Sequence, residues 1–234
     1  MIEFSGKKLL VIGGTSGMGF ATAKLAKTLG GTVMIASRNA ERVAGASARI
    51  GVEGRTLDVT DASGVDTFFS GAVWDHVIVT GSDVKIAAVR ELPLETARAS
   101  FESKFWGFYN VARAANITPG GSLTVIAGFL ATRPAAGRAL MGAINGALES
   151  LVQGLALELK PVRVNALSPG MVETEMWSGM TIETREAAFA KVRATYPAGC
   201  IGQPEDIARQ ILLLAATPFA TGTIVTLDGG ASIA

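Results

Sequence analysis

The chain has 234 residues, of which 49% are apolar, and its 21 basic and 20 acidic residues leave a net charge of +1. The apolar content argues against a disordered chain, and the charge balance offers no basic surface to nucleic acid or to an anionic membrane. No run approaches the ~20 apolar residues of a membrane-spanning helix, and no apolar signal segment stands near residue 1. With one cysteine, Cys200, the sequence predicts a cytoplasmic single domain over 1–234 without a disulfide, and we assign no metal site.

The first predicted strand, 9–12, runs into a glycine-rich turn, and apolar residues then recur at helical spacing from Phe20 onward. A strand, a glycine turn and a helix N-terminus form a phosphate cradle, because the helix end offers free N–H groups and partial positive charge. Glycine lets the backbone approach a pyrophosphate without a Cβ in the way. The alternative is a bare turn without a ligand. The residues predicted to bind the phosphates are Gly13, Thr15, Ser16, Gly17, Met18 and Gly19.

Strand-like and helix-like segments alternate through the rest of the chain, which is typical of an α/β fold with a parallel sheet. Predicted strands lie at 9–12, 32–36, 52–57, 74–80, 122–127, 162–167 and 221–230. Predicted helices lie at 40–50, 94–116 and 139–160, and a last helix opens after 202. The sequence therefore predicts a doubly wound, seven-stranded Rossmann fold with helices on both faces.

Two residues at the end of the second predicted strand bear on the choice of nucleotide. An acidic residue here hydrogen-bonds the ribose 2′-hydroxyl of NAD, whereas an arginine accommodates the 2′-phosphate of NADP. The positions hold Ser37 and Arg38, so the sequence favours NADP(H) and leaves NAD(H) possible. The alternative is that Arg38 is a solvated residue at the start of the 40–50 helix.

Four motifs occur in an order that resembles the short-chain dehydrogenase/reductase family. They are the G-x-x-x-G-x-G turn from Gly13, the P-G-x-x-x-T segment from Pro169, and the segments 202–208 and 221–230, so the resemblance covers about 7–230. It implies an NAD(P)-dependent oxidoreductase with a small-molecule substrate and a lid at about 173–197. Further cofactor contacts implied by the resemblance are Asp58, Val59, Thr80, Gly81, Asn145, Pro169, Gly170, Val172 and Thr174. As an alternative role, Asp58 or Thr60 caps the helix that follows.

The four residues on which the family's chemistry depends are absent. The tyrosine that exchanges a proton with the substrate falls at Met141, and the lysine four residues later falls at Asn145. The serine that orients the substrate falls at Gly128, and the asparagine of the preceding helix falls at Lys104. Because methionine cannot exchange a proton, the resemblance does not extend to the family's standard acid–base chemistry.

Lys104 and Asn145 look exchanged relative to the family pattern. We predict that the Lys104 ammonium enters the space of the missing lysine, with a lowered pKa and a hydrogen bond to the Asn145 amide. There it is a tentative proton donor, ahead of Tyr109 and Thr80. The alternative is a surface lysine beside Trp106.

Three functions remain open at this point. The first is an NADP(H)-dependent oxidoreductase with a rearranged site. The second is a non-catalytic NADP(H)-binding protein, such as a sensor or pseudoenzyme subunit, and the third is a structural member that binds no nucleotide. The long helices 94–116 and 139–160 carry more apolar surface than one sheet face needs, which predicts a homotetramer or homodimer.

The substrate is not named by the sequence, but the residues that flank its expected cavity are largely apolar, which favours an apolar ligand. Arg133 and Arg138 are candidates for binding an anionic substrate, or are exposed loop residues. The apolar candidates, some of which the core or lid alone would also explain, are Phe129, Leu130, Met141, Met171, Trp177 and Met180.

Overall fold

Seven strands form one parallel sheet, in the order β3-β2-β1-β4-β5-β6-β7, in a computed structural model that describes residues 2–234. The predicted doubly wound fold is confirmed. The strands are β1 (Lys8–Ile12), β2 (Thr32–Ser37), β3 (Glu53–Thr56), β4 (Trp74–Val79), β5 (Ile117–Ile126), β6 (Arg163–Pro169) and β7 (Ile224–Leu227).

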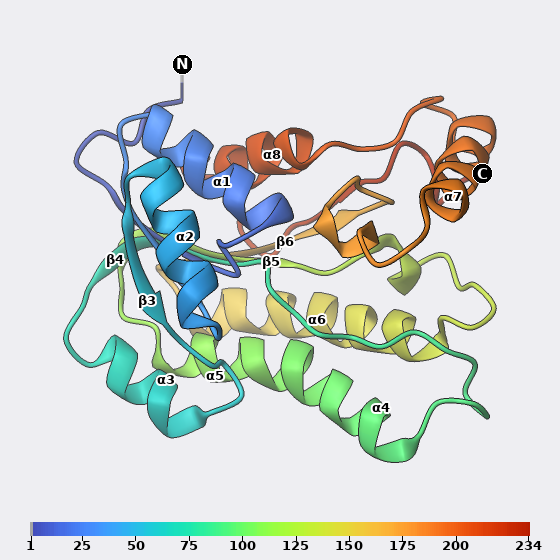
Figure 1. Ribbon diagram of the computed structural model, residues 1–234. Helices are drawn as coiled ribbons and strands as arrows, with labels where there is room; N and C mark the ends of the chain where they lie inside the picture. The colour runs from blue at the N-terminus through green and yellow to red at the C-terminus, as the bar shows by residue number, and fades with distance from the viewer. Residues whose placement is uncertain (1) are drawn as a thin grey trace.

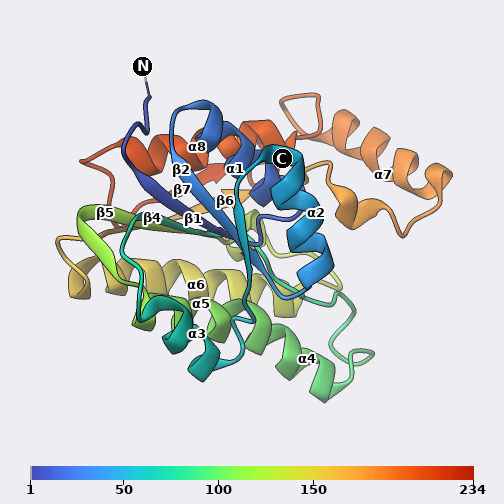
Figure 2. The same ribbon diagram turned by 60° about the vertical axis from the view of Figure 1, so that its left-hand side comes forward.

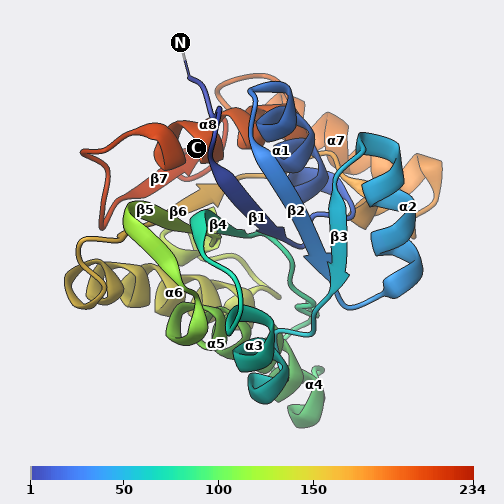
Figure 3. The same ribbon diagram turned by 90° about the vertical axis from the view of Figure 1, so that its left-hand side faces the viewer.

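Helices cover both faces of the sheet (Figure 1). On one face lie α1, α2 and α8, and on the other lie α3, α5 and α6 (Figure 3). Helix α7 projects away from both layers (Figure 2). The α-helices are α1 (Gly17–Thr28), α2 (Ala40–Ile50), α3 (Ala62–Phe69), α4 (Leu94–Phe101), α5 (Gly107–Ala114), α6 (Ala139–Glu158), α7 (Ile182–Thr195) and α8 (Pro204–Ala216). The shorter elements are the π-helical turn η1 (Glu102–Trp106) and the 3₁₀ turns η2 (Phe129–Ala131) and η3 (Glu175–Trp177).

Alternation along β1 builds a core on each face of the sheet. Leu10 belongs to the core that includes Phe108 of α5 and Leu148 of α6. Val11 points to the other face, into the core that includes Ile211 of α8. Successive side chains of a strand point to opposite faces, so a strand that is buried on both faces reads as a continuous apolar run.

The order of the strands places a crevice beside the glycine turn. Strand β1 pairs with β2 on one side and with β4 on the other, so the connections leave β1 and β4 in opposite directions. In open parallel sheets a ligand binds outside the carboxyl ends of the strands at such a switch point. The turn after β1 and the turn after β4 therefore define the site.

The single helix predicted over 94–116 is divided in the structure. Helix α4 ends at Phe101, the π-helical turn η1 follows, and α5 begins at Gly107. A π-helical turn adds a residue to one helical turn and often accompanies a functional site. Here the altered turn brings Ser103 and Lys104 to buried positions.

Several predicted element ends are also corrected by the structure. Strand β5 begins at Ile117 rather than at 122, with an irregular register opposite Trp74 and His76. Of the segment 221–230, predicted as the seventh strand and its exit, Ile224–Leu227 form β7. Chain reversals and strand edges carry few apolar residues, so periodicity locates them poorly.

Within residues 2–234, α6 is the one helix long and apolar enough to cross a membrane by length and composition. This helix corrects the expectation that no run in the sequence approaches that length. In the fold, Ile144, Leu148 and Val152 of this helix are fully buried in the core on one face of the sheet. Part of the apolar surface of α6 therefore packs into the core on one face of the sheet.

Candidate functional site

The glycine turn between β1 and α1 packs directly on the end of β4. A Cβ on Gly13 would lie 2.6 Å from Gly81 Cα and 2.7 Å from Thr80 Oγ1, and Gly19 faces the same hydroxyl from the first turn of α1. Thr80 Oγ1 in turn donates a hydrogen bond to Ile12 O at 3.1 Å. Gly13 also has a φ of +85°, so both its conformation and its contacts require glycine.

Two cavities open beside this turn. The larger, about 680 Å³, lies between the turn, α2 and residues 174–178, and the smaller, about 150 Å³, lies between the turn and the ends of β2 and β3. Thr80, Gly81 and Thr174, which the resemblance gives as cofactor contacts, line the larger cavity. The structure brings the predicted phosphate-binding residues together on these walls: Gly13, Thr15, Ser16, Gly17, Met18 and Gly19.

Two arginines face the cavities, Arg38 directly after β2 and Arg42 in the first turn of α2. Arg38 lines the smaller cavity with Ser37, and its Nη2 lies 3.8 Å from Asp83 Oδ2. Arg42 lines both cavities, and its backbone N donates to the α2 cap residue Asn39 at 2.8 Å. Arg42 was not among the site residues predicted from the sequence. The signal that points to it is its place four residues after Arg38, at the start of a helix.

Asp58 and Val59 line the smaller cavity at the end of β3. Asp58 Oδ1 accepts hydrogen bonds from Thr60 N at 2.9 Å and from Thr60 Oγ1 at 2.8 Å, and Asn110 Nδ2 donates to Val59 O at 3.0 Å. The N-cap of α3 is Asp61, so the capping role considered for Asp58 or Thr60 is wrong.

Lys104 points inward from η1. Its Nζ donates hydrogen bonds to Asn145 Oδ1 at 2.7 Å and to Ala127 O at 2.9 Å, and 9% of the residue is exposed. Burial lowers the pKa of Lys104 to about 8, an effect that the negative charge of Glu149 opposes. The predicted hydrogen bond between Lys104 and Asn145 is present, and the alternative of a surface lysine beside Trp106 is wrong.

The side chain of Asn145 stands where a side chain at residue 128 would be. A Cβ on Gly128 would lie 2.7 Å from Asn145 Nδ2 and 3.6 Å from Oδ1. The Lys104 ammonium can only donate hydrogen bonds, so the Asn145 atom that it contacts must be the amide oxygen. The amide nitrogen Nδ2 therefore lies over Gly128. An amide donor therefore stands in the space that a side chain at residue 128 would enter.

Glu149 and Ser168 extend this polar network. Ser168 Oγ donates a hydrogen bond to Glu149 Oε1 and accepts one from Gly128 N at 3.2 Å. Asn145 and Glu149 are one turn apart on α6, so they share a face of the helix. The network joins η1, α6 and the ends of β5 and β6 around Gly128.

Some predicted site residues lie elsewhere. Pro169 is buried in β6, and Gly170 and Val172 line a separate cavity rather than those at the glycine turn. Tyr109 is 40% exposed and packs edge-on against Trp106, with ring centroids 5.5 Å apart, so the structure does not bring it to Lys104. Among residues 2–234, no three His, Cys, Asp or Glu side chains are grouped to hold a metal.

The side chains considered for the substrate vary in their surroundings. Trp177 packs against Phe189 and donates from Nε1 to Val172 O at 2.8 Å, and Met180 is exposed. Arg133 is exposed, and Arg138 precedes the first turn of α6. The half-buried members of the apolar set are Phe129, Leu130, Met141 and Met171.

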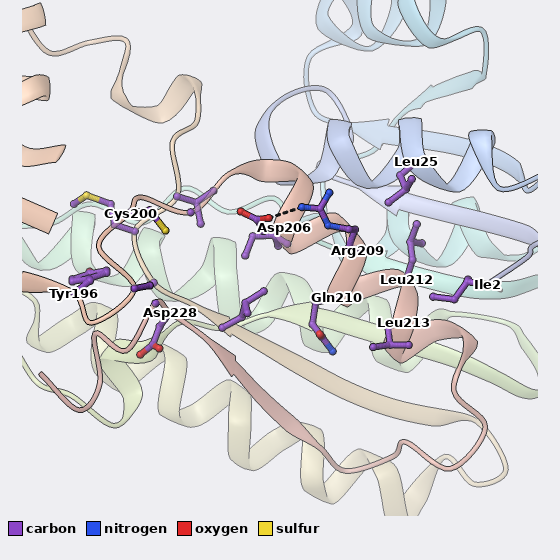
Figure 4. A pocket seen from close by; sticks show the side chains of 18 of the residues that line it. Ile2, Leu25, Tyr196, Cys200, Asp206, Arg209, Gln210, Leu212, Leu213 and Asp228 are labelled. Carbon is purple, nitrogen blue, oxygen red and sulfur yellow. Dashed lines mark hydrogen bonds and ion pairs between the residues drawn. The ribbon is translucent and has the colours of Figure 1, made fainter. Parts of the chain in front are cut away.

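The separate cavity, about 750 Å³, lies between α1, α8 and β7 (Figure 4). Its walls are mainly apolar, with Leu25 and Leu212 facing each other, and Arg209 pairs with Asp206 at 2.6 Å. Cys200 is exposed and lines the same cavity. Its lining shares no residue with the cavities at the glycine turn.

The chain matches the family described as enoyl-(acyl carrier protein) reductase over residues 13–232. ATR9, a short-chain dehydrogenase/reductase of Stachybotrys chlorohalonatus, is 34% identical over 99% of each chain. A solved small-chain dehydrogenase in complex with NADPH is 32% identical, with a TM-score of 0.84 over 97% of this chain and 99% of that one. A short chain dehydrogenase from Burkholderia cenocepacia in complex with NADP is 26% identical, with a TM-score of 0.86 over 99% and 100% of the two chains. On these matches and its fold, the chain belongs to the short-chain dehydrogenase/reductase family of oxidoreductases.

Proposed function

We propose that this protein is an NADP(H)-dependent oxidoreductase in which the Lys104–Asn145 pair takes the place of the family's serine, tyrosine and lysine. The observation that carries the proposal is the buried Lys104 ammonium, bonded to Asn145 at 2.7 Å beside the carboxyl ends of the strands. Burying a charge costs stability, and strongly shifted groups of this kind gather at functional sites. A screen of apolar ketones, aldehydes and conjugated enones with NADPH, followed by nucleotide fluorescence, tests for turnover.

The residues at the glycine turn fit NADP(H). A Cβ on Gly13 would fill the space against Gly81, the N-terminus of α1 faces the larger cavity, and Arg38 and Arg42 supply positive charge. Solved relatives in complex with NADPH and with NADP support the same cofactor. When bound, this cofactor supplies the hydride, and the protein supplies position and electrostatics.

We predict that Arg38→Ala and Arg42→Ala each weaken NADPH binding about tenfold or more, because each removes a charged contact to the 2′-phosphate. NADH binding is expected to change little, since NADH lacks that phosphate. Fluorescence titration with both nucleotides measures the effect. Arg113→Ala is the matched control, because Arg113 pairs with Asp66 away from these cavities. Equal losses for NADPH and NADH would contradict the assignment.

We propose that Asn145 stabilises the oxyanion formed during reduction and that Lys104 donates the proton. Reduction of a carbonyl leaves an oxyanion that must gain a proton. Asn145 Nδ2, held over Gly128, donates to that oxygen in the manner of an oxyanion-hole amide. Lys104 holds an exchangeable proton at Nζ, and its pKa of about 8 leaves that proton available for transfer near neutral pH.

One observation favours a second function, a non-catalytic NADP(H)-binding protein such as a sensor or pseudoenzyme subunit. Gly128 and Met141, at the serine and tyrosine positions, carry no exchangeable side-chain proton. Saturable NADPH binding without turnover across the substrate screen would identify this function. Failure to bind NADPH would instead point to a member of the family without a nucleotide.

We further propose an apolar small-molecule substrate, a lid segment over residues 173–197 and an intracellular location. Methionines adapt to irregular apolar ligands, and Met171, Met176 and Met180 lie in or beside this segment. Met176 is 67% exposed and lines the larger cavity.

We predict that the protein is a homodimer or homotetramer. The segment from α4 through η1 to α5 and the helix α6 present exposed apolar side chains, including Leu94 at 60%, Trp106 at 43% and Leu157 at 75% exposure. Surfaces of this kind usually mark an interface. Light scattering at micromolar concentration is expected to give the mass of two or four chains, and Leu157→Glu is expected to lower it. A monomeric wild type would contradict the prediction.

A further inference from the structure

A carboxylate from the lid segment sits on the N-terminus of α1. Gly17 N donates a hydrogen bond to Glu175 Oε2 at 2.8 Å, although the two residues lie 158 positions apart in sequence. Beside it, Thr174 packs so closely that a Cβ on Gly17 would lie 3.1 Å from Thr174 Cγ2. Both Gly17 and Glu175 line the larger cavity at the glycine turn.

This contact satisfies a donor that the start of α1 leaves open. Ser16 occupies the N-cap position, yet its side chain makes no capping hydrogen bond, and the first turn of α1 contains no acidic residue. A helix N-terminus carries free N–H groups and a partial positive charge that favour an anion. Glu175 supplies that anion from outside the helix.

The pyrophosphate of a dinucleotide uses the same feature of this fold, because it binds at the N-terminus of the helix after the glycine turn. Two anions within a few ångströms of each other repel, and one N–H hydrogen cannot satisfy both at full strength. Arg49 lines the same cavity and would stabilise either anion. The Glu175 carboxylate and the pyrophosphate therefore compete for the same N–H groups at the N-terminus of α1.

We propose that Glu175 competes with the nucleotide's pyrophosphate for the N-terminus of α1, so that nucleotide binding displaces residues 174–176 and couples the lid segment to occupancy of the site. The inference rests on the proposed nucleotide-binding function. It assigns Glu175 a regulatory role in that function: its contact with Gly17 lowers nucleotide affinity.

The lid segment is built to move at this contact while its base stays in place. At the base, Val172 bridges to Gly202, Glu173 N donates to Gly202 O at 2.9 Å, and the Trp177 indole donates to Val172 O. Between these anchored residues, Met176 is mostly exposed, so few buried contacts oppose a shift of residues 174–176. Exchange of one anion for another is then enough to reposition it.

The first test is nucleotide affinity. Glu175→Ala and Glu175→Gln are both expected to bind NADPH and NADH about three- to tenfold more tightly than the wild type, because the repelling charge is gone. The gain should be equal for the two nucleotides, since both carry the pyrophosphate. Glu173→Gln is the matched control: this neighbouring acid accepts from Gln203 Nε2 at 3.3 Å and does not contact the glycine turn.

Unchanged or weaker NADPH binding by Glu175→Ala would overturn the proposal. A gain in the alanine variant that the glutamine variant lacks would also overturn it, because the competition would then not depend on charge.

The second test reads the contact without nucleotide. Hydrogen exchange at the Gly17 amide, followed by NMR in the nucleotide-free protein, is expected to be faster in Glu175→Ala than in the wild type and in Glu173→Gln. Equal exchange rates would overturn the proposal. If the wild type fails to bind NADPH, the proposed function fails, whereas the exchange rates still decide whether Glu175 protects Gly17.

Discussion

Replacing Lys104 with methionine is expected to lower kcat/KM for NADPH-dependent reduction at least about 100-fold, because the variant loses both the buried positive charge and the proton at Nζ. NADPH affinity should fall more modestly, since Asn145 loses the donor that fixes its amide. Steady-state kinetics and fluorescence titration measure the two effects. Lys24→Met, at an exposed position on α1, is the matched control. Unchanged turnover in Lys104→Met would leave Lys104 a structural residue.

The pH dependence gives this prediction a second readout. The protonated form of Lys104 is the proton donor, and burial lowers its pKa to about 8. We therefore expect kcat/KM for reduction to be level below pH 8 and to fall above it in the wild type. Lys104→Met should lack this falling limb in whatever activity remains. A wild-type profile that stays level through pH 10 would contradict the assignment of Lys104 as the donor.

The lowered pKa of Lys104 also makes the free energy of unfolding depend on pH. Its pKa is about 8 in the folded protein and 10.5 as the ordinary value, so between these pH values the unfolded chain binds more protons. Stability due to this group is therefore reduced below pH 8 and rises as pH increases from 8 to 10.5, by on the order of 3 kcal/mol. Denaturant unfolding should show this rise for the wild type relative to Lys104→Met.

The second large effect is expected from Gly13→Ala. The new Cβ would lie 2.6 Å from Gly81 Cα, and the φ of +85° is strained for alanine. Because the nearest atoms are backbone, the turns after β1 and β4 must separate. We expect a loss of about 2–4 kcal/mol in the free energy of unfolding and a loss of NADPH affinity of more than tenfold. Denaturant unfolding and nucleotide titration measure the two.

A second glycine in the wall of the larger cavity, Gly45, provides a matched control for Gly13→Ala. Gly45 lines the same cavity from the middle of α2, and a Cβ there would have no heavy atom within 4 Å. Gly45→Ala is therefore expected to leave NADPH binding intact and to stabilise the helix by up to about 1 kcal/mol. If Gly13→Ala behaved like Gly45→Ala, the close packing of the glycine turn on β4 would not be required for binding.

The fold could be predicted because its signals are local. Buried parallel strands such as β1 and β4 read as apolar runs, and glycine marks the turn at Gly13, where a side chain does not fit. The division of the 94–116 helix could not be predicted, because a π-helical turn adds a single residue to one turn and has no residue signature of its own in this sequence.

The candidate site was predicted in part. The hydrogen bond between Lys104 and Asn145 followed from two residue types that look exchanged, whereas the orientation of the Asn145 amide over Gly128 depends on packing between α6 and β5. The contact between Glu175 and Gly17 joins segments far apart in sequence, so no periodicity or spacing indicates it. The roles given to these residues stay predictions.

Transfer of a labelled hydride tests the central claim most directly. NADPH carrying deuterium at the transferred position of the nicotinamide is incubated with wild type or Lys104→Met and with the apolar carbonyl and enone panel, and products are analysed by mass spectrometry. We predict one deuterium in a product made by the wild type, and formation of that labelled product at least about 100-fold more slowly by Lys104→Met. Tight NADPH binding by the wild type without label in any product would contradict a catalytic role, and equal labelling by both proteins would contradict the role of Lys104.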